Sequence, residues 1–575
     1  MNELKHDVDF CVIGGGMAGL CAAVAAARHG AEVALVQDRP VLGGNASSEM
    51  RMWVCGAHGE NNRETGILEE LQLENLRRNP LANWSIWDSV LWEAARFQKG
   101  LKLFLNTTCT GLEMDGPRIR TVHCRGLTNE KLHAISARLF ADCSGDSVLA
   151  PMSGAEFRIG REGREEFGED IAPEAADRKT MGLSLLLTVR ERPGPCAFTP
   201  PRWARVFESD AELPFRNHDI VKNPTNFWWI ELGGEADSIA DTEELRDELL
   251  AAAFGVWDHI KNRGDHGAAN WDLDWVGFLP GKRESRRYLG DHVLTQHDVR
   301  AEGRFEDIVA YGGWSMDDHH PAGLRHPGEP TVFHKAPSPY GIPYRSLYSR
   351  NVENLFCAGR NISATHAAMS STRVMATCSL VGQAVGTAAA LAADKGLSPR
   401  GVGQTSLAEL QAALMDDDCW LPWKRREIPE PARSAKLAAS AGDPEPLRSG
   451  VDRPQGADSN AWTAKPGSWV ECRFDRPRRV SEARMVFDSD LNRYRLGMRV
   501  NYPLAQTEQH LPPGLVKSFR LELLRAGERH PVVEESGNAQ RLVRRSLAGE
   551  AEGVRLTVLA THGAPEARVF AFHAL

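Results

Sequence analysis

Apolar and polar positions follow two different periods in the first forty residues. An apolar run at 10–13 predicts a buried strand, because parallel strands covered on both faces are apolar throughout. The Ala-rich stretch 20–29 predicts a helix that ends at Gly30, and the apolar run 31–36 predicts a second strand. This part of the sequence therefore predicts a β-α-β unit with a glycine-rich turn between the first strand and the helix.

The turn has the spacing G-x-G-x-x-G in the strand–turn–helix context that dinucleotide binding requires. The first glycine permits the tight turn, the second admits a pyrophosphate, and the third lets the helix pack closely on the strand. The helix N-terminus offers free N–H groups to phosphate. An ordinary tight turn is the weaker alternative, so we expect cofactor contacts at Gly14, Gly15, Gly16, Met17, Ala18 and Gly19.

Two further polar segments follow the second strand. In dinucleotide folds an acidic residue at this strand end bonds the ribose, but here the position is Gln37 with Asp38 next to it. The ribose contact is therefore open between these two residues. A glycine pair and small polar residues come next, and they suit a backbone nest around phosphate at Gly44, Asn45 and Ser48, with a simple turn as the alternative.

The motifs GGGMAG and RPVLGGNASSEMR, with a later Ala358-Gly359-Arg360, resemble the FAD-dependent oxidoreductase family with a glutathione-reductase-type FAD domain. The resemblance spans roughly residues 5–425 by its motifs. It implies FAD as the cofactor and a Rossmann-like α/β domain. It further implies FAD contacts near Cys109 for the adenine, at Ser144, Gly145 and Asp146 for the phosphate and ribityl chain, and at Gly359, Arg360 and Val374.

The fold class that we expect is α/β, with an inserted α+β domain and an all-β sandwich at the C-terminal end. The FAD domain should comprise 1–154 and 346–427, interrupted by a Trp-rich substrate domain at 155–345. A Pro-, Ser- and charge-rich stretch at 428–459 predicts a linker. Short alternating strands at 460–575 predict the sandwich, which resembles a galactose-binding jelly roll. For this sandwich we favour a packing or oligomer role slightly over sugar binding.

A nearly all-apolar stretch from Ser371 to Gly396 predicts a buried helix. The resemblance implies that its N-terminus faces the flavin, where the helix dipole and Arg373 would stabilise the anionic reduced ring. His366 lies just before this helix and is the leading candidate to take a hydroxyl proton during hydride transfer. A loop-capping role for His366 is about equally consistent. Weaker catalytic candidates are Arg283, His319 and Tyr344.

Composition excludes several other functions. The chain has 575 residues and a net charge of −9, which argues against a nucleic-acid partner. No apolar run approaches the roughly 20 residues that span a bilayer, and no signal peptide precedes the first strand, so we expect a cytoplasmic protein without a membrane partner. The 11 cysteines form no C-x-x-C pair, and His319-His320 lack a third ligand, so we expect neither disulfides nor a metal.

The sequence thus predicts an FAD-dependent oxidoreductase that transfers a hydride between flavin and a hydroxylated small molecule, with a carbohydrate as the expected class. One alternative is net non-redox glycoside cleavage through transient oxidation. Another is a carbohydrate-binding protein in which FAD is structural. A tRNA-modifying flavoprotein shares the first motifs, but the acidic charge argues against it. The motifs are compatible with a homo-oligomer and do not decide it.

Overall fold

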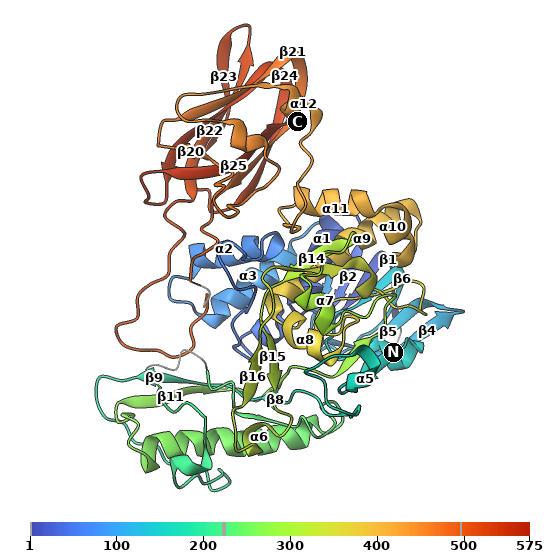
Figure 1. Ribbon diagram of the computed structural model, residues 1–575, viewed down its shortest axis with the longest axis vertical. Coiled ribbons are helices and arrows are strands. Elements are labelled where there is room, and N and C mark those ends of the chain that lie inside the picture. The colour runs from blue at the N-terminus through green and yellow to red at the C-terminus, as the bar shows by residue number, and fades with distance from the viewer. Residues whose placement is uncertain (1–2, 221–225, 495–496) are drawn as a thin grey trace. The chain divides into compact units, whose positions relative to one another are not determined.

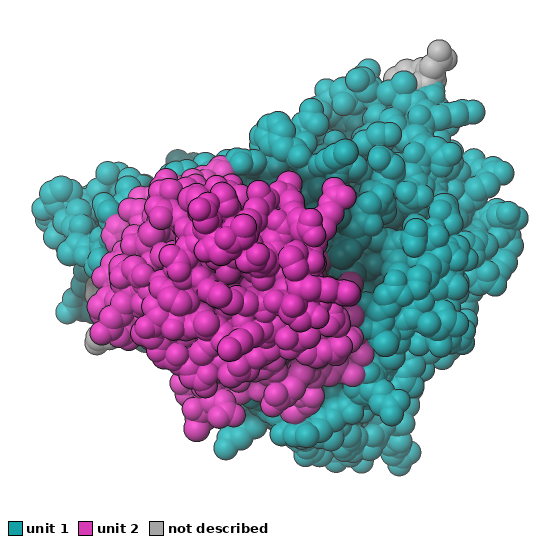
Figure 2. Space-filling view, turned by 90° about the horizontal axis from the view of Figure 1, so that it is seen from above, with its two compact units in different colours: residues 1–58, 81–410, 496–508 teal, residues 59–80, 411–495, 509–575 magenta. Residues whose placement is uncertain are grey.

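The computed structural model describes residues 3–220, 226–494 and 497–575. The chain divides into two units, each made of several segments (Figure 2). Unit 1 contains 1–58, 81–410 and 496–508, and unit 2 contains 59–80, 411–495 and 509–575. This division differs from the predicted ranges: the FAD segments and the insertion form one unit, whereas the predicted linker belongs to unit 2.

A mixed seven-stranded sheet forms the centre of unit 1, in the order β3-β2-β1-β6-β5-β4, with β18 also paired to β6. Strands β1, β2 and β3 are parallel, and β4 to β6 form an antiparallel meander. The first half of β6 pairs with β5 and its last residues pair with β18. The strands are β1 (Glu3–Ile13), β2 (Val33–Val36), β3 (Leu101–Phe104), β4 (Thr107–Asp115), β5 (Arg118–Gly126), β6 (Leu132–Asp142) and β18 (Leu355–Cys357).

Two buried helices, α1 (Met17–Arg28) and α9 (Met375–Lys395), pack against each other beside this sheet (Figure 1). A Cβ atom at Gly382 or Gly386 would overlap the backbone oxygen of Ala18 or Ala22, so only glycine permits this approach. Within the described residues α9 alone is long and apolar enough to span a membrane, with a mean hydropathy of 1.4. The expectation that no apolar run approaches that length is therefore wrong. Burial of 89% of its apolar window explains the composition.

The remaining helices of unit 1 are shorter or belong to the insertion. The helix predicted from Ser371 is interrupted at residues 373–374. Ser371 therefore belongs to α8 (His366–Thr372), and a second helix, α9, begins at Met375. The helices are α3 (Trp84–Arg96), α4 (Leu149–Ser153), α5 (Arg164–Phe167), α6 (Thr242–Asp258), α7 (Gln296–Arg300), α8 (His366–Thr372) and α10 (Pro399–Thr405), while α11 (Leu407–Asp416) crosses the boundary between the units.

The insertion folds around its own apolar core, in which α6 contributes Leu249, Val256 and Trp257. Its strands form small antiparallel sheets rather than one large sheet. They are β7 (Phe157–Ile159), β8 (Leu183–Ser184), β9 (Leu187–Glu191), β10 (Glu231–Leu232), β11 (Trp271–Val276), β12 (Gly281–Lys282), β13 (Arg286–Tyr288), β14 (Ile308–Gly312), β15 (Met316–His319), β16 (Thr331–His334) and β17 (Tyr340–Pro343).

Unit 2 is the expected all-antiparallel sandwich, with strand order β20-β25-β21-β24-β22-β23 and β19 paired to β21. Leu73 of helix α2 (Ile67–Arg78) is fully buried in its core, so this early helix completes the sandwich. The other elements are α12 (Glu430–Ser434), β19 (Lys436–Ala439), β20 (Trp462–Ala464), β21 (Trp469–Phe487), β22 (Val516–Arg525), β23 (Glu528–Glu535), β24 (Leu542–Thr561) and β25 (Ala567–Ala574).

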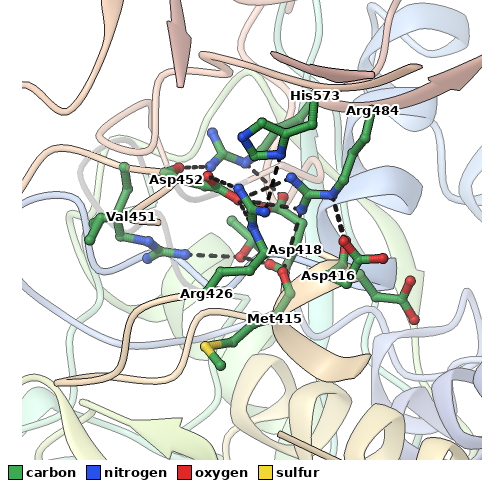
Figure 3. A network of polar contacts seen from close by, with 12 residues as sticks. Met415, Asp416, Asp418, Arg426, Val451, Asp452, Arg484 and His573 are labelled. Carbon is green, nitrogen blue, oxygen red and sulfur yellow. Dashed lines mark hydrogen bonds and ion pairs between the residues drawn. The ribbon is translucent and has the colours of Figure 1, made fainter. Parts of the chain in front are cut away.

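A buried polar network explains why residues 428–459 are part of unit 2 (Figure 3). The Asp452 carboxylate accepts two hydrogen bonds from Arg426, both of 3.1 Å, and lies 3.3 Å from the Arg484 guanidinium. Burial alone would raise the pKa of Asp452, but the two guanidinium groups outweigh burial and hold it well below its ordinary value. Arg426 also donates to His573 on β25. The stretch predicted as a linker is thus anchored in the sandwich.

Candidate functional site

A cavity of about 370 Å³ lies in unit 1, where the carboxyl ends of β1, β2 and β6 meet the N-termini of α1 and α9. In open α/β sheets, ligands bind at the carboxyl ends of the strands. The cavity is lined by most of the residues predicted to contact a dinucleotide: Gly14, Gly16, Met17, Ala18, Gln37, Asp38, Gly44, Asn45, Cys109, Ser144, Gly145, Asp146, Gly359, Arg360 and Val374.

The three glycines of the motif meet the requirements of a pyrophosphate site. Gly14 has φ +102, and a Cβ atom there would approach the Cys143 carbonyl to 2.5 Å. A Cβ atom at Gly19 would overlap the Gly14 oxygen, so Gly19 serves helix packing and lies outside the cavity wall. By contrast, an added Cβ at Gly16 meets nothing within 4 Å. The space beside Gly16 is therefore the open part of the cavity, next to a helix N-terminus that no side chain caps.

The structure distinguishes the two ribose candidates. The Gln37 side chain is buried; its Oε1 accepts the Gly15 N–H at 2.7 Å and its Nε2 donates to the Val41 carbonyl at 3.3 Å. Gln37 thus holds the glycine turn, and Gly15 contributes to that turn rather than to the cavity wall. Asp38 also lines the cavity, with 55% of its side chain exposed. The geometry favours Asp38 as the residue that reaches a ribose hydroxyl.

The glycine pair after β2 returns to the first turn. The Gly43 N–H donates to the Gly15 oxygen at 2.9 Å, and Gly44 begins the short 3-10 turn η1 (Gly44–Ala46). Asn45 donates from Nδ2 to the Lys282 carbonyl at 3.1 Å, which ties this segment to the insertion. Ser48 does not line the cavity, because the chain has turned towards α3 and its N–H donates to Asp88 at 3.0 Å.

Asp146 is the centre of a charged cluster in the cavity wall. Its carboxylate accepts from Lys282 at 2.7 Å, from Ser285 at 2.8 Å and from Arg360 at 2.8 Å. Burial alone would raise the pKa of Asp146, but Arg360 and Lys282 hold it below its ordinary value. The Arg360 Nε is buried without a partner among the described residues, so it is a donor ready for a phosphate or ribityl oxygen.

Lys282 was missed as a site residue in the sequence analysis, although it begins a basic run with Arg283. Several other wall residues have no feature that could mark them individually in the sequence. These are Arg39, Glu49, Met50, Met52, Cys55, Thr107, Thr108, Ser184, Leu186, Trp228, Thr242, Leu279, Met375 and Cys378. Thr107 and Thr108 stand beside Cys109 at the start of β4, and all three line the cavity.

The N-terminus of α9 faces the cavity, as the resemblance implied. Val374 occupies the N-cap position without a side-chain cap, and Met375 and Cys378 of the first turn line the wall. The break between α8 and α9 places Arg373 in the wall as well. The Ala376 N–H donates to the Cys55 carbonyl, while the positive end of the helix and the Arg373 guanidinium lie at the same part of the wall, which suits a ring system that becomes anionic on reduction.

Arg373 and Arg283 belong to a chain of alternating charges behind this part of the wall. Arg283 lies 3.2 Å from Glu231, and Arg373 lies 3.1 Å from Asp317. His319 lies between the two carboxylates, with Nδ1 at 2.6 Å from Glu231 and Nε2 at 3.3 Å from Asp317. His319 is therefore outside the cavity, and it connects the residues that hold the two arginines.

The structure does not bring His366 to the cavity wall. His366 is the first residue of α8 rather than part of a preceding loop, and its ring is buried between two carboxylates. Nδ1 lies 2.9 Å from Glu284 and Nε2 lies 3.1 Å from Asp318. Burial alone would lower the pKa of His366, but these carboxylates raise it to about 10. A doubly paired imidazolium has no free nitrogen for a hydroxyl proton, which argues against the predicted role.

Tyr344 also lies away from the cavity. Its ring is buried and its hydroxyl donates to the Pro399 carbonyl at 2.7 Å. Burial raises the pKa of this phenol well above its ordinary value, so Tyr344 remains neutral. Its place in the turn after β17 reflects packing against α10, and the structure gives it no contact with the proposed chemistry.

A search of curated proteins found no match to this chain. Among solved structures, a family 32 carbohydrate-binding module of Streptococcus pneumoniae EndoD matches at 19% identity, covering 24% of this chain and 94% of the module, with a TM-score of 0.19. The family 32 module of C. perfringens NanJ, solved with galactose, matches at 11% identity, covering 25% of this chain and 95% of that one, with a TM-score of 0.19.

The solved structure of Thermovibrio ammonificans THI4 matches at 20% identity over 30% of this chain and 76% of that chain, with a TM-score of 0.22. These structural scores are too low to carry the assignment, which rests on the sequence family. The family model described as FAD dependent oxidoreductase matches residues 9–414. That range includes the glycine turn, the insertion and all four arginines that line the cavity. The chain belongs to the FAD dependent oxidoreductase family.

Proposed function

We propose that this FAD-dependent oxidoreductase acts on an uncharged, hydroxylated small molecule, with a carbohydrate as the expected class. One observation carries the proposal: Arg283 and Arg373, two of the four arginines in the cavity wall, are each paired with a buried carboxylate. These two residues therefore offer strong hydrogen-bond donors while their charges are compensated. An anionic substrate would gain little from such a wall, whereas a hydroxyl oxygen gains a donor.

The cofactor fits the remaining wall residues. Gly16 and the α1 N-terminus suit the pyrophosphate, Asp38 suits a ribose hydroxyl, and Arg360 supplies a free donor. FAD, when bound, supplies a two-electron acceptor or donor for hydride transfer. The N-terminus of α9, which no side chain caps, would stabilise negative charge on the flavin ring.

The residues near α9 would then hold the substrate. Trp228 lines the cavity and is half-buried, so part of its ring is free to cover the apolar face of a sugar. The Trp228 carbonyl accepts from Arg283 at 3.2 Å, which fixes the two side by side. Among the described wall residues there is no histidine. Oxidation of an alcohol releases a hydride, which FAD would accept when bound, and a proton, which would leave to solvent water. We assign stabilisation of the oxygen that loses this proton to the guanidinium groups.

The test is an anaerobic titration of the FAD-loaded protein, followed by its visible flavin absorbance. Neutral sugars and polyols are compared with sugar acids of the same carbon number. We expect bleaching by one or more neutral compounds and little by their acids. Preferential bleaching by acids would refute the charge argument. Conversion of a glycoside without bleaching or an added acceptor would favour the non-redox alternative, and sugar binding with no turnover would favour structural FAD.

Two variants of Arg373 test whether its guanidinium group contributes to flavin reduction by the substrate. Arg373→Gln removes the cation from the wall, and we expect bleaching to slow by about 10²-fold or more, the usual cost of losing one transition-state donor. Arg373→Lys keeps the charge and should retain more of the rate. Flavin content is measured for both variants, so that loss of cofactor is distinguished from loss of hydride transfer.

A further inference from the structure

A second cluster of polar side chains lies in the insertion, apart from the cavity described above. Asp210 begins the short turn η2 (Asp210–Glu212). His259 begins η3 (His259–Arg263), a π-turn that continues the long helix α6 in the lower part of Figure 1. His266 follows in the next loop. Single π-turns are rare in proteins, and those that occur are frequently found at functional sites. None of these three residues lines the cavity of the cofactor.

Three ligand-type atoms converge in this cluster. The Asp210 Oδ1 lies 2.8 Å from the His259 Nε2 and 3.2 Å from the His266 Nε2. The two Nε2 atoms lie 3.2 Å from each other. Ligands bound tetrahedrally to one ion at about 2.0–2.1 Å stand about 3.3 Å apart, so the two 3.2 Å separations are close to the edges of a metal site, and the 2.8 Å separation would lengthen when an ion binds.

The hydrogen bonding of His259 supports a cation at this point. Its Nδ1 lies 3.0 Å from the Phe207 carbonyl, which can only accept, so Nδ1 carries a hydrogen. Its Nε2, on the other side of the ring, is the nitrogen that faces the Asp210 carboxylate, so an ion placed here would lie between two ligand atoms. Donation from the other ring nitrogen to a backbone carbonyl is also the usual second contact of a metal-binding histidine.

A fourth side chain with an unused nitrogen stands next to the cluster. The His218 ring is stacked on His266 at 4.9 Å between centroids and lies 5.1 Å from His259. Its Nε2 is buried and has no hydrogen-bond partner among the described residues. Buried polar atoms without partners are rare in native proteins and need an explanation. The His218 ring would have to turn from this stacked position for its nitrogen to reach an ion held by the other three residues.

We propose that Asp210, His259 and His266 bind a divalent transition-metal ion, with His218 as the fourth ligand. Two or three imidazoles and one carboxylate suit Zn²⁺ best among the common ions, since hard Mg²⁺ and Ca²⁺ prefer oxygen ligands. This departs from the expectation of no metal. The Asp210 side chain is 67% exposed and gives the ion a path from solvent, while His259 is fully buried. The ion ties η2 to the end of α6, so its role is structural.

The test uses the full-length protein after dialysis against a chelator. Zn²⁺ alone is titrated by calorimetry at neutral pH, and Co²⁺ is added separately to record its absorption spectrum. We expect one tight equivalent of Zn²⁺ and an intense tetrahedral Co²⁺ spectrum that Zn²⁺ abolishes. Asp210→Asn and His266→Ala should each weaken binding by at least about tenfold. Asp210 is exposed and His266 is half-buried, so both variants should fold.

Two further variants complete the design. His218→Ala should weaken Zn²⁺ binding and shift the Co²⁺ spectrum, because it removes the fourth ligand. His326→Ala is the matched control, since His326 forms another histidine pair by stacking on His320 at 3.6 Å. Absence of Zn²⁺ binding by the wild type would overturn the proposal. So would equal binding by wild type, Asp210→Asn and His266→Ala, or loss of binding in the control alone.

Discussion

The buried, neutral side chain of His573 leads us to expect that unit 2 loses stability as the pH falls below neutrality. The ring is buried on β25, where Nδ1 accepts from Arg426 at 3.3 Å and Nε2 donates to the Leu447 carbonyl at 3.1 Å (Figure 3). These partners require the neutral imidazole, with one hydrogen on Nε2. Burial, then Arg426 and Arg484, lower the pKa of His573 to about 3. The folded unit therefore excludes a proton that the unfolded chain binds.

The sign and size of the effect follow from proton linkage. A lowered pKa contributes stability that is present above the unfolded value, about 6.5, and lost as the pH falls towards the folded value. Between these limits the unfolded state binds one more proton, so each pH unit costs about 1.4 kcal/mol. From pH 7 to pH 5 the contribution of His573 falls by about 2 kcal/mol.

Hydrogen exchange of peptides covering Ala567–Ala574 measures this loss in unit 2 alone. The perturbation is His573→Gln, whose amide can donate to Leu447 and accept from Arg426 but does not titrate. We expect the free energy of opening to fall by about 2 kcal/mol more in the wild type than in the variant between pH 7 and pH 5. The control His530→Gln changes an exposed histidine on β23 and should behave as wild type. Equal pH dependence in wild type and His573→Gln would refute the reasoning.

Three further changes test other parts of the molecule. Gly16→Glu fills the open side of the glycine turn and should abolish FAD binding, whereas Gly194→Glu, where an added Cβ also meets nothing, should purify as yellow as wild type. Gly382→Ala places a methyl group against the Ala18 oxygen. It should lower the free energy of unfolding of unit 1 by about 1–3 kcal/mol, which calorimetry measures. His366→Gln removes the cation that the buried Glu284 shares with Arg287 and that Asp318 also contacts, so it should lower stability at pH 7. Flavin reduction by dithionite should be unchanged, and a normal melting temperature would contradict the paired imidazolium.

The cofactor site could be predicted because its signals are local. The strand, the three glycines and the helix of the first turn are consecutive in the sequence, and the structure places Gly14 and Gly16 in the cavity wall. The sandwich was predictable for a similar reason, since alternation within each strand records which face is buried.

The rest depends on contacts between residues distant in the chain. His366 is paired with Glu284 and Asp318, which are 82 and 48 positions away, and no local pattern marks such pairs. The same holds for the histidine and aspartate cluster, where His259 and Asp210 are 49 positions apart. The composition of 428–459 is typical of a linker, but Asp452 within it pairs with the buried side chains of Arg426 and Arg484, which lie outside the stretch.

The interleaved segments of the two units constrain how this protein can be made and divided. Because residues 59–80 belong to the sandwich, no single cut separates it from the flavin-binding part. A gene shortened after residue 410 would still encode α2, whose Leu73 would then have lost its apolar surroundings. During synthesis on the ribosome, α2 emerges long before β25 (Ala567–Ala574), so the core of the sandwich cannot be complete until β25 has been synthesised. We therefore expect that unit 2 cannot be transferred to another protein, or removed from this one, without changing unit 1 as well.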